Sequence, residues 1–482
     1  MSTEVGIGLR EAARSLSIEP GTIRYWIKRG WIKVIQEASG QGKPMILDRQ
    51  SVMACHAIRT KKDKRYNKYM PQTMEQEMTH DFQFLPSGTL TSPDGFIAGA
   101  TFAGMKTYSD DKLDLGIVYS TSPAVSAGIF TTNQVRSPSV ILTEKHVRNG
   151  KVRAIVANSG IANAVVGEPG VKDAEEVVRL AAIQLDLPQG EIGFLSTGIV
   201  GVELPMALIR AALPQTDIST KGGNEFARAI MTTDTHPKEA AVSYEHKGRT
   251  ITVGGVAKGA GMIHPNMATL LSVLTTDANV GQSYLQEVIE SAGDQSFNMI
   301  SIDGDTSTND SLIIMANGTA SGPIIEKDSE EGSIFQEAVT QLCIHLSKQV
   351  VLDGEGVSKL FEVKIVGARN YNEARLGARA VSSSNLVKTA VHGNDPNWGR
   401  LVVALGRSGA RVKEDKLSVY INDVCIMENG LPVPFFKDAI VLQMQNPEVK
   451  FTIDIGIGNS TASAWGCNLS EGYVTFNSAY TT

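Results

Sequence analysis

Thr269 opens an apolar run directly after a turn of small residues, in the stretch GVAKGAGMIHPNMATLLSVLTTDA (255–278). A threonine hydroxyl is a poor nucleophile unless a base lies beside it. If the chain cut itself before Thr269, the freed α-amino group, with a pKa of about 8, would be that base on the same residue. Lys258 would bring a positive charge, and Gly259 and Gly261 would permit tight backbone geometry.

The same threonine has a simpler interpretation. Threonine is a common strand former, and TLLSVLTTD reads as a buried strand that begins at Thr269. On these residues alone the strand former is the commoner case, and the nucleophile stays an open alternative.

Other familiar chemistries find little support. The run GIGNST (456–461) has no third glycine for a dinucleotide loop, and no GxxxxGK[ST] phosphate loop occurs. The run DGDTSTND (303–310) lacks the glycine and the terminal glutamate of a calcium loop. No HExxH or histidine cluster suggests a metal. GRSGA is no nucleophile elbow, although a Ser-His-Asp triad is not excluded.

The elements around these residues alternate between strands and helices. KVRAIVANSG (151–160) and SLIIMANG (311–318) read as strands, and YLQEVIESAG (284–293) reads as a helix. Asp173 followed by Glu176 is typical of a helix N-terminus. This alternation predicts an α/β body with at least one sheet covered by helices.

Composition sets the broad class. The 482 residues are 42% hydrophobic and 20% charged, which predicts a globular chain of two or three domains. No apolar run is long enough for a membrane span, and the N-terminus lacks a signal-peptide pattern. The four cysteines are scattered, which disfavours a disulfide framework. We therefore expect a cytoplasmic protein.

The first 70 residues differ in charge from the rest. They carry 14 lysines and arginines against 6 aspartates and glutamates, whereas the whole chain has a net charge of −6. LREAARSLSIEPGTIRYWIKRGWIKVI (9–35) has two short helical patterns around a turn, and GKPMILDRQSV (42–52) suggests a strand. The stretch resembles the helix-turn-helix of MerR and excisionase proteins, which implies DNA binding. The alternative is a helical appendage that packs on the body or a partner.

The body resembles the ornithine acetyltransferase family of arginine biosynthesis from about Leu85 to the last residue. Seven motifs in the family's order carry the resemblance: STGIVG (196–201), IMTTDTHPK (230–238), GGVAKGAGMIHPNMATLL (254–271), IDGDTSTND (302–310), VVLDGEGVSK (350–359), KTAVHGNDPNWGR (388–400) and GYVTFNSAYTT (472–482).

The resemblance implies self-cleavage between Ala268 and Thr269 into chains of 268 and 214 residues. Thr269 would then take acetyl from N2-acetyl-L-ornithine and pass it to L-glutamate, a glutamate N-acetyltransferase reaction of ping-pong type. The family's oxyanion stabilisers fall on Thr197 and Gly198. Its substrate contacts, besides Thr269, fall on Thr233, Lys258, Glu355, Asn477 and Thr482. Thr235 is an alternative to Thr233.

The resemblance further implies a two-domain layered α/β body without a cofactor or metal, and with acetyl-CoA as an open second acetyl donor. The expected segments are a helix-turn-helix domain (1–60), a linker (61–84), an alpha fragment (85–268) and a beta fragment (269–482). The fragments would stay associated, and homo-oligomers are expected. Use of Thr482 as a ligand predicts that a C-terminal tag weakens activity.

Two departures and two rivals accompany this prediction. Ile161 and Val165 stand where the family usually has asparagine and cysteine, and the family normally lacks a helix-turn-helix. One rival is a DNA-binding regulator whose enzyme-like body senses ornithine or a related metabolite. The other keeps the threonine chemistry but acts on a different amide.

Overall fold

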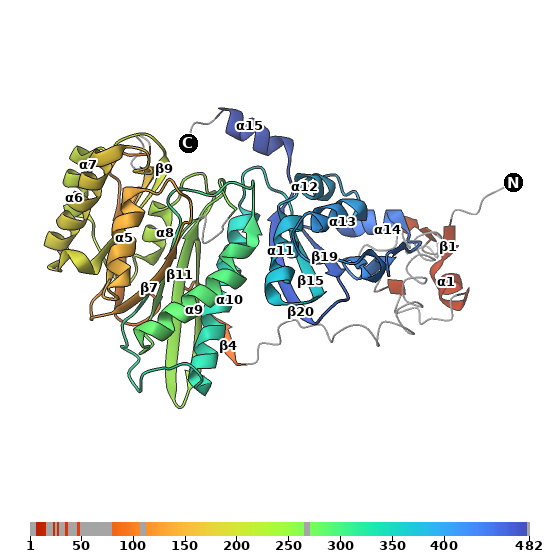
Figure 1. The fold of residues 1–482 in the computed structure, drawn as a ribbon, viewed down its shortest axis with the longest axis horizontal. Helices are drawn as coiled ribbons and strands as arrows, with labels where there is room; N and C mark the ends of the chain where they lie inside the picture. Colours follow the sequence, from red (N-terminus) through yellow and green to blue (C-terminus); the bar gives the residue numbers. More distant parts are fainter. Residues whose placement is uncertain are drawn as a thin grey trace, which may run out of the picture. The chain divides into compact units, whose positions relative to one another are not determined.

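The computed structural model of the chain (Figure 1) describes residues 6–15, 23–24, 27, 34–36, 46–48, 80–106, 112–264 and 270–479. The predicted cleavage site at Ala268 and Thr269, the predicted ligand Thr482, and most of the head and linker lie outside these residues. The chain divides into two compact units. One contains residues 1–77 and 359–462, and the other contains residues 78–358 and 463–482.

The larger unit, 78–358 with 463–482, contains a six-stranded sheet in the order β4-β10-β11-β12-β14-β7. Strands β12 and β14 are parallel, and the other neighbours are antiparallel. Lys258 ends β11 and pairs with Leu271 at the start of β12. The bounds of these strands are Phe82–Phe84 (β4), Val125–Phe130 (β7), Lys238–His246 (β10), Arg249–Lys258 (β11), Leu271–Thr276 (β12) and Ser311–Ala316 (β14).

A second sheet of the same unit has four strands in the order β5-β6-β8-β9. Its strands β8 and β9 are parallel, and the pairing shifts register at Gly160 and Ile161, next to the end of β9. The bounds are Phe96–Thr101 (β5), Leu115–Ser120 (β6), Ala154–Ile161 (β8) and Ile192–Ile199 (β9).

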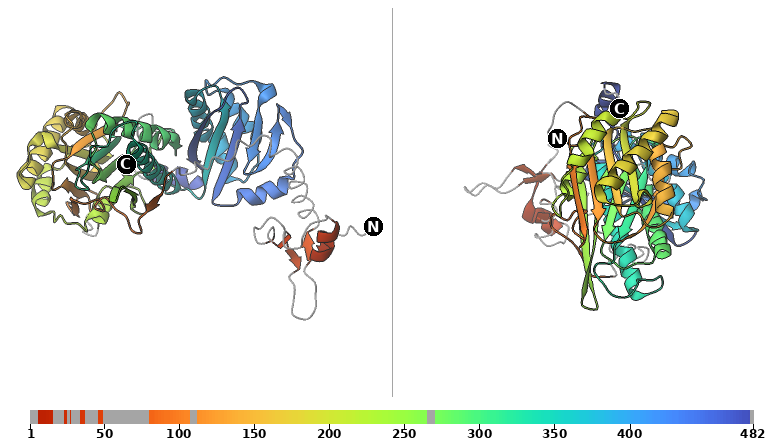
Figure 2. Two further views of the ribbon diagram at one scale, coloured as in Figure 1. Left: turned by 90° about the horizontal axis from the view of Figure 1, so that it is seen from below. Right: turned by 90° about the vertical axis from the view of Figure 1, so that its left-hand side faces the viewer.

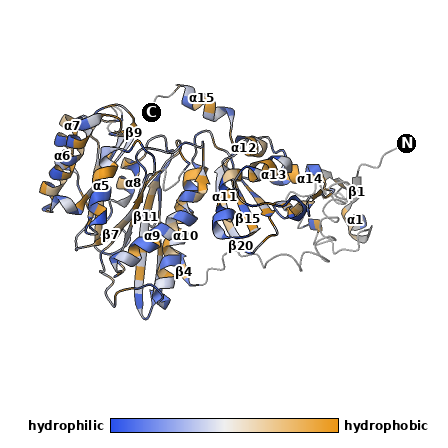
Figure 3. Ribbon diagram, viewed as in Figure 1, coloured by the Kyte–Doolittle hydropathy of each residue, from blue (hydrophilic) through white to orange (hydrophobic). Residues whose placement is uncertain are grey.

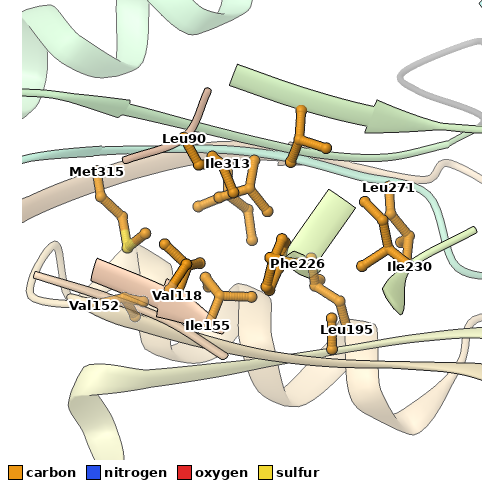
Figure 4. Close-up of a cluster of buried hydrophobic side chains, with 14 of the residues drawn as sticks. Leu90, Val118, Val152, Ile155, Leu195, Phe226, Ile230, Leu271, Ile313 and Met315 are labelled. Carbon is orange, nitrogen blue, oxygen red and sulfur yellow. The ribbon is translucent and has the colours of Figure 1, made fainter. Parts of the chain in front are cut away.

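The two sheets share one hydrophobic core (Figure 4). Val118, Ile155 and Leu195 from the four-stranded sheet lie in the same buried cluster as Leu271 and Ile313 from the six-stranded sheet. Because these strands are buried on both faces, apolar residues do not alternate with exposed polar ones. The polar residues of β12, in the sequence LSVLTT, are themselves buried.

Helices cover the outer face of each sheet. Helices α9 and α10 pack against the six-stranded sheet, while α5 and α6 pack on the four-stranded sheet (Figures 1 and 2). These helices carry both hydrophilic and hydrophobic residues (Figure 3), as a helix between a core and water should. The helices of this unit are Pro138–Arg148 (α5), Gly167–Leu185 (α6), Met206–Ala212 (α7), Gly223–Ala229 (α8), Gln282–Gln295 (α9), Glu330–Leu352 (α10) and Glu471–Ala479 (α15).

The other unit contains a sheet in which β15 and β19 are parallel, β19 and β16 are antiparallel, and β17 and β18 follow in antiparallel order. Helix α11 packs on β15 and against α13. The bounds are Leu360–Ala368 (β15), Ser418–Ile421 (β16), Val424–Glu428 (β17), Leu431–Pro432 (β18), Glu448–Asp454 (β19), Tyr371–Ser382 (α11), Asn385–His392 (α12), Trp398–Gly406 (α13) and Lys437–Met444 (α14). Strand β20 (Ser460–Cys467) runs along the sequence from this unit into the larger one, where Trp465 and Gly466 pair with β13 (Ile300–Ser301).

In the head, the structure describes a short helix, α1 (Leu9–Ser15), and three antiparallel strands in the order β1-β3-β2. Strand β3 falls inside the segment 42–52, where a strand is predicted. Ala12, Ala13, Ile23 and Leu47 are buried, whereas Arg24 is exposed. Apart from Ile27, the other residues of the predicted second helix lie outside the described residues, so the helix-turn-helix stays a prediction. The strand bounds are Gly6–Gly8 (β1), Val34–Gln36 (β2) and Ile46–Asp48 (β3).

The layered α/β prediction is confirmed, and the strands at 151–160 and 311–318 and the helix at 284–293 are found as β8, β14 and α9. The predicted helix start at Asp173 is wrong. Helix α6 begins at Gly167, so Asp173 lies inside it. Pro169 suggests that no helix has started before it, but it lies in the first turn of α6. Proline is tolerated there because its missing N–H would have no partner in the helix.

Candidate active site

Lys258 lies at the centre of the candidate site, at the end of β11. Its side chain is almost fully buried, with 7% of the residue exposed. The ammonium Nζ donates to Thr232 Oγ1 at 2.8 Å and to Thr197 Oγ1 at 3.2 Å. No carboxylate among the described residues forms an ion pair with it. A buried cation held only by neutral hydroxyls is prepared to bind an anion.

Thr197 and Gly198 lie in the last three residues of strand β9, and Thr197 contacts Lys258. Because the Thr197 hydroxyl accepts from Lys258, its own proton is available to an oxygen elsewhere in the site. Gly198 has a φ of +129°, and a Cβ there would lie 2.2 Å from the backbone carbon of Gly160. Only glycine fits this position.

The β8 and β9 ends that carry Thr197 are fixed by buried Asn309. Its amide donates to the carbonyls of Ser196 at 2.7 Å and Ala162 at 2.6 Å. Ile161, one of the departures from the family pattern, lies opposite Thr197 in the shifted register. Its carbonyl, not its side chain, accepts from the Ser196 hydroxyl at 2.7 Å. The substitution therefore leaves this bond intact.

The other departure, Val165, has a φ of +59° and is 62% exposed. A left-handed backbone is costly for a β-branched residue. Nothing in the structure explains why valine stands there.

The turn after Lys258 is held from three directions. Gly259 N–H donates to Asp234 Oδ1 at 2.7 Å, and the carbonyl of Ala260 accepts from Glu355 N–H at 2.9 Å. The backbone N–H groups of Met262 and Ile263 both donate to Asp303. Asp303, the first residue of the rejected calcium loop, thus shapes the turn that leads toward the predicted cleavage site.

Glu355 and Asn477 meet directly in the larger unit. Asn477, on helix α15, donates from Nδ2 to Glu355 Oε2 at 2.8 Å. The Glu355 carboxyl group also packs on Gly261, where an added Cβ would lie 2.7 Å from its atoms. Gly261 is therefore small because the carboxylate of Glu355 occupies the space a side chain would need.

A buried charge cluster lies behind Lys258. Lys238 Nζ donates to Asp234 Oδ1 at 2.5 Å and also pairs with Asp353, and all three side chains are at most 3% exposed. Asp234 Oδ2 accepts from Thr232 N–H at 2.9 Å. Asp353 accepts from the backbone N–H and the hydroxyl of Thr235.

The electrostatics of the site follow from burial. Burial lowers the pKa of Lys258, while the carboxylate of Asp234 opposes that shift and the ammonium of Lys238 adds to it. Burial alone would raise the pKa of Asp234, but the charges of Lys258 and Lys238 and the N–H of Thr232 outweigh it and lower this pKa to about 2. Asp234 is thus ionised, and its negative charge offsets part of the effect that burial has on the pKa of Lys258.

The structure brings together five of the site residues expected from the sequence: Thr197, Gly198, Lys258, Glu355 and Asn477. Thr233 is half-buried between two residues that contact the site, but its side chain forms no hydrogen bond to another described residue. The hydroxyl of its alternative, Thr235, is bound to Asp353. Ala268, Thr269 and Thr482 lie outside the described residues, so their roles stay predictions.

Sequence reasoning missed Thr232, Asp234, Lys238 and Asp353. A signal was present for Lys238, because it precedes Ala240, Val242 and Tyr244 at the two-residue spacing of a strand face. These four residues of the strand face, Lys238, Ala240, Val242 and Tyr244, are all buried. A lysine in phase with a buried face requires carboxylate partners, and Asp234 is four residues away.

Within the described residues, no group of three or more histidine, cysteine, aspartate or glutamate side chains is arranged to hold a metal ion. None of the helices in the same part of the chain is long and apolar enough to cross a membrane.

The two sheets that share one core under covering helices define a layered α/β protein, and its candidate site is centred on a buried lysine that faces two threonine hydroxyls. The model of the ArgJ family matches residues 97–482, and the chain belongs to this family. The arginine biosynthesis bifunctional protein ArgJ of Dehalococcoides mccartyi is 44% identical over 405 residues, which is 84% of this chain and all of that protein. The protein of the same name from Symbiobacterium thermophilum is 45% identical over 82% of this chain and 99% of its own length. A solved structure, the arginine biosynthesis bifunctional protein argJ from Bacillus halodurans, is 37% identical, with coverage of 43% of this chain and 97% of that chain and a TM-score of 0.42.

Proposed function

We propose that this chain is a glutamate N-acetyltransferase of arginine biosynthesis, which moves acetyl from N2-acetyl-L-ornithine to L-glutamate through an acetyl-Thr269 intermediate. The observation that carries the proposal is the buried Lys258 ammonium, bound to the hydroxyls of Thr197 and Thr232 and to no described carboxylate. Both amino-acid substrates carry an α-carboxylate, which is a suitable partner for this cation.

The chemistry begins with hydrolysis of the peptide bond between Ala268 and Thr269, in which a water supplies the oxygen of the new Ala268 carboxylate and the α-amino group of Thr269 is freed. That amine takes the proton of the Thr269 hydroxyl, directly or through one water, and the oxygen attacks the acetyl carbonyl of N2-acetylornithine. The C–N bond breaks, and ornithine leaves with the proton. The amine of glutamate then attacks the threonyl ester, giving N-acetylglutamate and restoring the hydroxyl.

Thr197 and Gly198 would stabilise the negative oxygen in both half-reactions. The Thr197 hydroxyl accepts from Lys258, so its proton can point at the developing charge. Donors of this kind are worth about 3 kcal/mol each, because they are in place before the charge forms. Glu355 would bind a substrate ammonium or handle protons at the threonine amine, with Asn477 fixing its carboxylate.

The position of the cut supports lasting association of the two fragments. Strand β11 ends before residue 269 and β12 begins after it, and the two pair over six residues from Val253 to Lys258. The fragments would therefore share one sheet. We further infer that the protein is cytoplasmic and forms a homo-oligomer. Size-exclusion chromatography with light scattering would test the oligomeric state.

The deciding experiment is the denatured mass of the purified protein beside a Thr269→Ala variant, followed by an acetyl-transfer assay with N2-acetylornithine and glutamate. We expect two fragments from the wild type, an intact variant, and N-acetylglutamate from the wild type alone. An uncut wild-type chain of 51.7 kDa would remove the amine base and favour the metabolite-sensing rival. Acetyl-CoA should be tested as a second donor, because the relatives are called bifunctional.

A second function is proposed for the head on its own observation, the excess of 14 basic over 6 acidic residues in the first 70. We infer that the head binds DNA electrostatically through residues 1–60. Affinity for a duplex should fall steeply with salt. A variant lacking residues 1–60 should weaken this binding and keep acetyl transfer. A variant lacking residues 1–70, the whole basic stretch, should lose the binding, and unchanged binding in that variant would exclude the head as the contact.

A further inference from the structure

Among the described residues, no carboxylate forms an ion pair with Lys258, although several act on its charge. Asp234, Asp310 and Glu355 all act on its charge from the surrounding elements, as do the ammonium groups of Lys238 and Lys106. Yet its hydrogen bonds run to two hydroxyls. An ionised carboxylate free to move would be expected to pair with such a buried cation, so something must hold the nearest one away.

Lys238 is placed to do this. Its side chain is 0% exposed, and its ammonium binds Asp234 and Asp353 together. Asp234 therefore faces Lys238 with the same oxygen, Oδ1, that accepts from Gly259 N–H, the residue directly after Lys258. The Asp234 carboxylate is thus held at the backbone of Gly259, next to Lys258, but its ion pair is with Lys238.

The cluster also fixes the segments that carry the site. Asp234 accepts from Thr232 N–H, and the hydroxyl of Thr232 is the nearer of the two that bind Lys258. Asp353 binds Thr235 and lies two residues before Glu355. One buried ammonium thus orders the Thr232 loop, the end of β11 and the Glu355 turn.

The charges of the cluster balance. Lys238 and Lys258 carry two positive charges, and Asp234 and Asp353 carry two negative ones. Lys238 pairs with both carboxylates, and Nδ1 of His236 also lies 3.3 Å from Oδ1 of Asp353. Without the Lys238 charge, two buried carboxylates would remain. Asp353 would keep its contact with His236, whereas Asp234, bound to the N–H of Gly259 and acting on the charge of Lys258, would have Lys258 as its cation.

We propose that Lys238 is a positioning residue for acetyl transfer, an internal counterion that binds Asp234 and Asp353 and so keeps Lys258 available for the substrate carboxylate. The proposal rests on the function proposed above. Lys238 itself touches no substrate and acts through Lys258.

A positioning role can be distinguished from a merely structural ion pair by the pH dependence of kcat/KM, because removing Asp234 and removing Lys238 should shift its alkaline limb in opposite directions. The carboxylate of Asp234 favours the protonated form of Lys258, while the ammonium of Lys238 disfavours it. If the substrate needs protonated Lys258, Asp234→Asn should move the alkaline limb of kcat/KM to lower pH, and Lys238→Met should move it to higher pH. Each shift should be at least about half a pH unit, because charges within a few ångströms shift a pKa by roughly one unit or more.

The test uses the full chain, with fragment formation and thermal melting checked for each variant. Lys238→Arg keeps the charge and should leave the limb in place. Lys238→Met should also raise KM for N2-acetylornithine more than it lowers kcat, because Asp234 then competes with the substrate carboxylate for Lys258. Asp310, Glu355, Lys106 and His236, which contacts Asp353, are unchanged in all variants and cannot produce opposite shifts.

Should Lys238→Met fail to fold or to cut itself, the double variant K238M/D353N takes its place. It removes one carboxylate with the ammonium and leaves Asp234 beside Lys258, so the limb should still move to higher pH. Limbs that move in the same direction, or an unshifted limb in Asp234→Asn, would overturn the inference. A wild type that transfers no acetyl would instead refute the proposed function.

Discussion

The amide of Asn477 donates to the carboxylate of Glu355 over 2.8 Å, although the two residues are 122 positions apart. The contact is supported at both ends. Tyr473, one turn earlier in α15, donates its hydroxyl to Asp303 at 3.3 Å, and Ser470 donates to the carbonyl of Gly356. Helix α15 thus connects the Glu355 turn with the aspartate that shapes the turn after Lys258.

Replacing Asn477 with alanine should lower kcat/KM for N2-acetylornithine roughly 10- to 100-fold, because a hydrogen bond to a charged group contributes about 1.5–3 kcal/mol. Asn477→Asp should be worse, since it sets a second carboxylate against Glu355. Ser478→Ala is the matched control, because the Ser478 hydroxyl donates only within the helix, to Thr475. Equal losses in Asn477→Ala and Ser478→Ala would mean that helix packing, not this bond, matters.

Thr197→Val should lower kcat by about 10²–10³ with little change in KM, as loss of one oxyanion donor does. Thr197→Ser keeps the hydroxyl and should retain most of the activity. The prediction concerns mature enzyme, so fragment formation must be confirmed by mass before kinetics. A large rise in KM with normal kcat would instead assign Thr197 to ground-state binding.

The choice among the threonines of TTDT can be settled by comparing single valine variants. Thr232→Val removes the closer hydroxyl on Lys258 and should cost about 1.5–3 kcal/mol in kcat/KM, since it leaves a buried ammonium short of one partner. Thr235→Val breaks a bond to Asp353 and should act mainly on melting temperature. If Thr233 is the substrate ligand, Thr233→Val should lower kcat/KM without lowering the melting temperature. An unchanged kcat/KM in Thr233→Val would assign the substrate contact to Thr232 instead.

The sequence could predict the α/β class, several strands and helices and five residues that gather at the site, because these depend on local patterns and on motifs carried by a known family. It could not predict the Asp234–Lys238–Asp353 cluster. The strand-face spacing could mark Lys238 as buried and Asp234 as a nearby partner, but Asp353 is 115 residues from Lys238 and has no such local signal. Only the pairing of β10 with β11, which sets Lys238 opposite Ala257, brings it to the end of the strand that Lys258 closes.

Two glycines of the site should respond differently to alanine. Gly198→Ala forces a Cβ to 2.2 Å from the backbone of Gly160 at a φ of +129°. We expect this variant to melt at a lower temperature and to lose activity, because neither backbone can yield cheaply. In Gly261→Ala the clash is with the end of the Glu355 side chain, which can rotate away. That variant should melt normally but behave kinetically like Asn477→Ala. A normal melting temperature for Gly198→Ala would contradict the strain argument.

Acid stability should report the charge of Asp234. Its pKa in the folded protein is about 2, below the roughly 3.9 of an unfolded aspartate, so the folded state favours the ionised form. This contribution, on the order of 2 kcal/mol, is complete above about pH 4 and is lost as the pH falls toward 2. Asp234→Asn should therefore lower the melting temperature at pH 6 and flatten its dependence on pH between about 5 and 2. Asp303→Asn, whose carboxylate also accepts backbone N–H groups, serves as the comparison. An Asp234→Asn curve parallel to that of the wild type would show that the ionised carboxylate adds no net stability.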